Sequence, residues 1–180
     1  MTMRNTKNTF GSVSKFLHWV IALLVIVMVS AGWFMDDISN DALKLTIYNL
    51  HKLTGITILF LMLVRLAWAL TNPKPVSPKG TSVVQHFVEW GGHFFLYALI
   101  IAQPITGWVG SVAAGHVPHL GQWQLNLPIM KSEALTTLCF KSHTIIAILI
   151  IVTVSLHVLA ALYHHYIRKD NVLTRMMPGV

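Results

Sequence analysis

The chain has few charged residues and a single cysteine. Charged side chains make up 11% of its 180 residues, whereas a soluble domain carries about 25%. The acidic residues number 6, against 13 Lys and Arg. The lone Cys139 excludes an internal disulfide, and it also excludes a CxxC or iron–sulfur motif, because each of these needs at least two thiols. No repeat or low-complexity tract is present. The composition therefore argues against a soluble domain.

Long apolar runs take the place of charge. Hydrophobic residues make up 54% of the chain, and they concentrate in runs at about 16–34, 47–70, 88–113 and 142–167. Each run is long enough to cross the hydrocarbon core of a bilayer. Each must be helical there, because a helix satisfies its own backbone polar groups. We therefore expect an all-α integral membrane protein, with residues 1–180 forming one four-helix bundle domain.

The distribution of Lys and Arg predicts the orientation of these spans. Cytoplasmic loops are enriched in basic residues, so both termini are expected in the cytoplasm, in a bacterial inner membrane. A cleaved signal peptide is the competing interpretation, but the first run is longer than a usual signal-peptide core. The basic residues at the cytoplasmic ends of the spans also account for the net charge of +7, so a nucleic acid partner is not needed to explain it. The basic residues on the predicted cytoplasmic side are Arg4, Lys7, Lys15, Arg65, Lys74, Lys79, Arg168, Lys169 and Arg175.

The fourth run carries two histidines with an informative spacing. His143 and His157 are 14 residues apart, which on a helix is about 21 Å and nearly four full turns. Both imidazoles therefore point the same way at two depths. The first run enters the membrane from the cytoplasm, so His18 near its start lies at the inner face, at the depth of His157. The second and fourth runs begin at the outer side, so His51 and His143 lie near the outer face. An ionisable residue inside a membrane is a functional candidate by default.

Two pairs of histidines at two depths predict two stacked haems b. Each pair can clamp one iron from opposite sides, and bundle cores are common cofactor sites. A bare zinc or copper ion would need its ligands gathered at one point, which the 21 Å spacing on one helix forbids. Taken singly, each histidine is more often an interfacial or hydrogen-bonding residue, so the prediction depends on the matched depths. Two ligands per iron favour electron transfer over oxygen binding.

Other residues near these pairs have two interpretations each. Arg65 lies 14 residues after His51, so it is a candidate partner for a propionate of the inner haem or a side chain that snorkels to the interface. Gly55 either leaves room for a porphyrin or allows close helix packing. Lys52 and Lys141 adjoin the outer histidines and either attract an anionic substrate or anchor charge at the interface.

The remaining histidines give weaker signals. His93 is a candidate for lining a quinone pocket, although packing is the favoured role, and neither it nor His86 has an obvious partner at its depth. His116 and His119 fall in the outer loop and are expected to be solvated. His164 and His165 lie beside Tyr163 and Tyr166, which favours an interfacial belt. A quinone or proton-handling role is the alternative.

Several segments resemble the bacterial cytochrome b561 family, including its superoxide oxidase-like branch. They are KFLHW (15–19), NLHKLTG (49–55), HFFLYALIIAQPITGW (93–108), SHTIIA and LHVLAAL in the fourth run, and HHYIRKDNVLTRMMP (164–178). The resemblance covers nearly the whole chain. It implies that His18, His51, His143 and His157 ligate two haems b and that ubiquinone accepts the electrons. In the superoxide oxidase-like branch, it implies superoxide as the donor at the periplasmic side.

The expected function is electron transfer across the membrane. Electrons would enter at the outer haem, pass to the inner haem and reduce ubiquinone, which makes the chain a superoxide:ubiquinone oxidoreductase. One alternative is a cytochrome b subunit that relays electrons from a dehydrogenase or hydrogenase partner. Another is a haem-free transporter or scaffold. The segment at about 114–140 is expected to shape access to the outer haem and so to decide the small electron donor.

Overall fold

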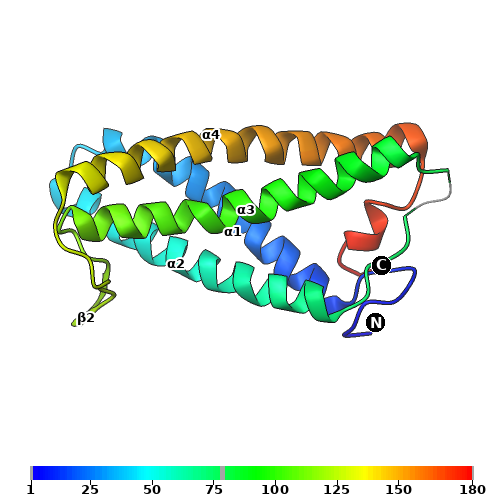
Figure 1. Ribbon diagram of the computed structural model, residues 1–180, viewed down its shortest axis with the longest axis horizontal. Coiled ribbons are helices and arrows are strands. Elements are labelled where there is room, and N and C mark those ends of the chain that lie inside the picture. Colours follow the sequence, from blue (N-terminus) through cyan, green and yellow to red (C-terminus); the bar gives the residue numbers. More distant parts are fainter. Residues whose placement is uncertain (1, 78–79, 180) are drawn as a thin grey trace.

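Four long helices run between the two ends of the molecule in the computed structural model (Figure 1). They are α1 (Ser12–Phe34), α2 (Asp41–Thr71), α3 (Val83–Ala113) and α4 (Glu133–Tyr163). Short elements complete the fold: η1 (Met35–Asp37), β1 (His119–Leu120), β2 (Trp123–Gln124), a π-helical turn η2 (His164–Arg168) and η3 (Thr174–Met176). The structure describes residues 2–77 and 80–179. Lys79, used above to predict orientation, and the first and last residues of the expected domain lie outside the described residues.

Each helix begins before the apolar run that predicted it. The side chain of Asn40 accepts a hydrogen bond from the amide of Leu43, and Ser132 does the same at the start of α4. Ser82 forms a capping box with Gln85 at the start of α3. Such caps satisfy amides that have no partner within the helix. Capped first turns therefore extend α2, α3 and α4 beyond the hydrophobic segments.

The helices alternate in direction, so both chain ends lie at one end of the bundle together with the connection from α2 to α3 (Figure 1). The α1–α2 connection and the segment between α3 and α4 lie at the opposite end. The most extensive helix contacts join α3 to α4, α2 to α3 and α1 to α2. The expected four-helix bundle is confirmed, with both termini on the same side. Below, the end with the termini is called the inner end and the opposite end the outer end.

Large apolar side chains cover the outside of the helices. Phe16, Leu23, Phe60 and Leu156 are each more than 60% exposed. A surface this apolar is unfavourable in water, whereas lipid tails solvate it. All four helices are long and apolar enough to cross a membrane. The protein is therefore an integral membrane protein that crosses the bilayer with each helix.

A compact apolar layer fills the centre of the bundle. Its centre lies midway between the two histidine levels, because Ile150 is seven residues from both His143 and His157, and Ile58 is seven residues from both His51 and Arg65. On α1 it extends to the inner level at Leu17. The buried side chains of this layer are Leu17, Ile21, Val25, Ile58, Met62 and Ile150.

The C-terminal segment folds back across the inner end of the bundle. The indole Nε1 of Trp19 donates to the carbonyl of Met176 at 2.8 Å. Nη1 of Arg175 donates to the carbonyl of Val76 at 2.5 Å. Trp19 also contacts the neighbouring ring of His18 edge-on, with centroids 5.5 Å apart. The tail thus closes the bundle beside one of the four predicted ligands.

Candidate functional site

The inner histidines meet across the bundle. His18 on α1 and His157 on α4 have ring centroids 6.2 Å apart and planes inclined by 53°. Both side chains are partly buried. A metal ion about 2 Å from one nitrogen of each of two imidazoles holds the ring centroids roughly 6 Å apart. The pair therefore has the separation that two imidazoles holding one metal ion between them would need.

The outer histidines form a second pair of the same kind. His51 on α2 and His143 on α4 have ring centroids 6.5 Å apart, with planes inclined by 67°. The depth-matched pairing expected from the sequence is thus present in the structure. The ligand role of the four histidines stays a prediction.

The surroundings of His143 suit a metal ligand. Its Nδ1 donates to the backbone carbonyl of Gln103 at 2.9 Å and lies 3.2 Å from the hydroxyl of Thr106. A carbonyl can only accept, so the ring proton sits on Nδ1 and the lone pair of Nε2 is available to a metal. A carbonyl contact of this type orients many metal-binding histidines.

Both outer rings also lie against glycines from helices that carry no predicted outer ligand. A Cβ on Gly107 of α3 would come within 2.9 Å of Cε1 of His143, and a Cβ on Gly32 of α1 would lie 3.3 Å from Cε1 of His51. The buried Nδ1 of His51 has no hydrogen-bond partner among the described residues. The outer rings are thus cradled by backbone and keep ring nitrogens available for a ligand.

Arg65 lies at the inner pair, as its spacing from His51 predicted. Its Nη2 contacts Nδ1 of His18 at 2.9 Å, and its Nε donates to the hydroxyl of Tyr97 at 3.2 Å. The guanidinium carbon also lies 5.7 Å from the centre of the Tyr97 ring, within range of a cation–π contact. The side chain is therefore held inside the bundle rather than at the interface. Its role toward a propionate is untested.

His93 is closer to the site than the sequence predicted. Its ring centroid lies 5.5 Å from that of His157, with the planes at 83°, and its Nδ1 donates to the carbonyl of Glu89 at 2.7 Å. The expectation that His93 lacks a partner at its depth does not hold. α3 begins at Val83 rather than near Val88, so His93 lies about 7 Å deeper than the apolar run suggested.

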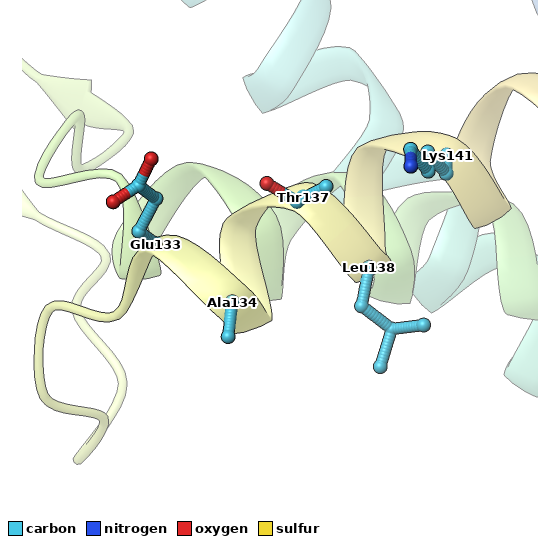
Figure 2. A pocket seen from close by; sticks show the side chains of 5 residues that line it. All are labelled: Glu133, Ala134, Thr137, Leu138 and Lys141. Carbon is cyan, nitrogen blue, oxygen red and sulfur yellow. The ribbon is translucent and has the colours of Figure 1, made fainter.

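The two outer lysines differ in their surroundings. Nζ of Lys52 donates to the carbonyl of His116 at 3.0 Å, and the nearby Asn49 makes two hydrogen bonds with the backbone of His119. Lys52 therefore holds the outer loop. Lys141 is exposed, on a shallow surface hollow of α4 that it shares with Glu133, Ala134, Thr137 and Leu138 (Figure 2).

The contacts of Gly55 and of the histidines outside the two pairs are explained by packing and solvation. A Cβ on Gly55 would make ordinary contacts with Pro104 and Met28, at 3.8 and 3.9 Å, which fits close helix packing. His116 and His119 are exposed, as expected of a solvated loop. His165 stacks edge-on against Tyr166.

Asp170 fixes the end of α4 through His164, whose Nδ1 lies 2.6 Å from its carboxylate. Burial raises the pKa of Asp170, but hydrogen bonds from His164 and from the amide of Val172 outweigh this and hold it below the ordinary value. This contact gives His164 a structural role at the end of α4, away from the two histidine pairs.

The donor set fits a porphyrin iron better than a bare metal ion. Among the described residues, no three His, Cys, Asp or Glu side chains gather as metal ligands. Pairs of imidazoles alone suit an iron whose remaining positions are filled by a macrocycle. The single Cys139 is buried and free.

A family model described as "Prokaryotic cytochrome b561" matches residues 9–179. The chain belongs to this family. Cytochromes b561 bind haem b, and with its four membrane-spanning helices this cytochrome b561 is a multi-pass electron-transport protein of the bacterial inner membrane.

Individual relatives agree with this assignment along nearly the full chain. The cytochrome is 29% identical to "Cytochrome b561 homolog 2" of Escherichia coli K12, over 98% of this chain and 95% of the relative. It is 34% identical to "Probable superoxide oxidase CybB" of Yersinia pestis, over 90% and 92% of the two chains. It is also 27% identical to "Cytochrome b562" of Cereibacter sphaeroides, over 89% and 90%.

Proposed function

We propose that this cytochrome b561 binds two haems b and carries electrons from the outer to the inner side of the membrane. His51 and His143 would hold the outer haem, and His18 and His157 the inner haem. The observation that carries this proposal is the pair of imidazole separations, 6.5 and 6.2 Å, at two levels of one bundle. Bound haem supplies a reversible one-electron centre, and two imidazole ligands leave no open position for oxygen.

Arg65 has a specific part in this arrangement. When Nε2 of His18 ligates a metal, the ring proton must sit on Nδ1. Nδ1 can then no longer accept from the guanidinium that now lies 2.9 Å away. The freed Arg65 would turn toward another acceptor at this depth, and a haem propionate offers the paired oxygens that a guanidinium binds best.

We propose superoxide as donor and ubiquinone as acceptor. The support for superoxide is the 34% identity to a relative named as a probable superoxide oxidase and the exposed Lys141 two residues from His143. In the balanced reaction, two superoxide anions each lose one electron and become oxygen. One ubiquinone gains both electrons together with two protons and becomes ubiquinol.

A relay subunit for a partner dehydrogenase is the second candidate. The observation that favours it is the hairpin of β1 and β2 at the outer end, where Leu120 and Trp123 are 67% and 79% exposed. Large exposed apolar side chains of this kind are common at protein–protein interfaces.

The purified protein mixed with superoxide and a ubiquinone analogue tests the first candidate. We expect a reduced-minus-oxidised spectrum of low-spin haem b with two haems per chain. We also expect haem reduction on addition of superoxide and reoxidation by the quinone. If superoxide leaves the haems oxidised while a chemical reductant reduces them, the donor is wrong and the relay candidate is favoured. A colourless preparation would contradict both.

Lys141 and Lys52 are expected to affect reduction by superoxide in different ways. Lys141→Gln removes an exposed charge, so the second-order rate should fall roughly two- to fivefold at low ionic strength and match wild type at high salt. Lys52→Gln also releases the loop at His116, so its effect should persist at high salt. Stopped-flow rates of haem reduction across a salt series measure both. A Lys141→Gln defect that is independent of salt would rule out electrostatic attraction.

A further inference from the structure

A group of polar side chains connects the inner end of the bundle with the inner histidine pair. At its centre is Glu89, on the second turn of α3. Lys74 lies 3.0 Å from one oxygen of Glu89. Ser77 donates to the other oxygen at 3.4 Å, and His86 lies 4.0 Å from it. A carboxylate with several polar neighbours near the end of a membrane-spanning helix is a candidate for a function.

One side of this group is exposed to solvent at the inner end of the bundle. The side chains of Lys74 and His86 are 55% and 62% exposed, whereas that of Glu89 is 34% exposed. Lys74 and Ser77 belong to the connection between α2 and α3, which lies beside the chain termini. The hydroxyl of Ser77 is also 3.4 Å from Nδ1 of His86. Exchangeable protons can therefore reach the carboxylate from the aqueous phase at this end.

At its other side the group leads toward the inner pair. His93 lies one helical turn after Glu89 and donates Nδ1–H to the Glu89 carbonyl at 2.7 Å. The His93 ring then contacts that of His157 edge-on, with centroids 5.5 Å apart. Glu89 and His93 share one face of α3 because they are four residues apart. The helical turn that carries Glu89 is thus linked to the predicted inner ligand through one side chain, that of His93.

We propose that Glu89 takes up protons from the inner aqueous phase and supplies them to ubiquinone as it is reduced at the inner pair. The proposal rests on the function proposed above. Each ubiquinone takes two electrons, which come from two superoxide anions, and it takes two protons to become ubiquinol. Each proton that leaves the Glu89 carboxyl is replaced from water along Ser77 and His86, and the ion pair with Lys74 lies outside this path.

The charged and titratable groups around Glu89 come from four parts of the chain. Lys74 approaches from the connection, and His86 and His93 from α3 itself. Arg65 of α2 and His157 of α4 lie beyond His93. Among these described neighbours Glu89 is the single carboxylate. Its replacement by glutamine therefore removes the acid from the path while keeping nearly the same shape.

Stopped-flow reoxidation of the reduced holoprotein by a short-chain ubiquinone tests the proposal. Glu89→Gln should slow quinone-driven haem reoxidation by at least about tenfold, because a positioned proton donor contributes on the order of a hundredfold or more. Glu89→Asp should recover part of the rate, and formate should partly rescue Glu89→Gln. Haem reduction by superoxide without quinone should be unchanged. The infrared difference spectrum on reduction should lose a carboxylic acid band in Glu89→Gln.

Two controls separate this role from a structural one. Lys74→Gln removes the same ion pair but keeps the acid, and Glu133→Gln removes a carboxylate at the other end of the bundle. Both should reoxidise within about threefold of wild type. If Glu89→Gln also stays within that range at every pH, Glu89 has no proton role although the proposed function stands. If wild type itself fails to react with ubiquinone, the acceptor is wrong and this role falls with it.

Discussion

Replacing His143 by alanine is expected to remove the outer haem, and replacing His157 the inner haem. Each variant should retain about half of the haem of wild type. The two residues share α4, and each faces a different partner, His51 at 6.5 Å and His18 at 6.2 Å between ring centroids. The loss of one imidazole should therefore affect one pair only. Pyridine haemochrome analysis per mole of protein measures the content.

The matched controls are histidines outside the pairs. His119→Ala changes an exposed side chain of the outer loop, and His165→Ala changes a half-buried one at the inner end; both should keep two haems. Haem that remains after loss of one ligand should become five-coordinate and high-spin, which the optical spectrum distinguishes. Full low-spin haem content in both His143→Ala and His157→Ala would disprove the ligand assignment.

A single methyl group at position 107 is expected to disrupt the outer site. In Gly107→Ala, the Cβ would lie 2.9 Å from Cε1 and 3.2 Å from Nδ1 of His143. The ring cannot easily move aside because the carbonyl of Gln103 holds its Nδ1. We therefore expect His143 to lose its orientation, with loss of the outer haem or a clear shift of its midpoint potential, while the inner haem stays unchanged. Redox titration followed optically resolves the two.

Gly92→Ala is the matched control on the same helix. Nothing lies within 4 Å of a Cβ built at Gly92. Alanine is favoured over glycine within helices by up to about 1 kcal/mol, so Gly92→Ala should leave both haems in place and should not lower thermal stability. Two haems with wild-type potentials in Gly107→Ala would show that the close approach to His143 is not required.

The spans and the pairing of histidines could be predicted from the sequence because each depends on one helix at a time. Apolar runs in a membrane must be helical, and the 14-residue spacing of His143 and His157 fixes two levels on one face. The direction of crossing then assigns His18 and His51 to those levels. None of these steps requires knowledge of how the helices pack.

Features that depend on packing between helices escaped prediction. The contacts of His143 with Gln103 and Gly107 depend on how α3 is rotated about its own axis relative to α4. The spacing of residues along one helix does not reveal this rotation. The position of His93 depended on the capped start of α3 at Val83, which lies before the apolar run. The attachment of Lys52 to the outer loop joins segments 64 residues apart, and an irregular loop has no periodicity to place it.

The apolar layer between the two histidine levels has a consequence for energy conservation. Electrons can tunnel through a thin layer of aliphatic side chains, but protons need a continuous chain of water or polar groups. The buried Ile21, Met62 and Ile150 provide neither. In the function proposed above, electrons would therefore cross this layer without a return leak of hydrogen ions, and the bundle would not short-circuit the proton-motive force.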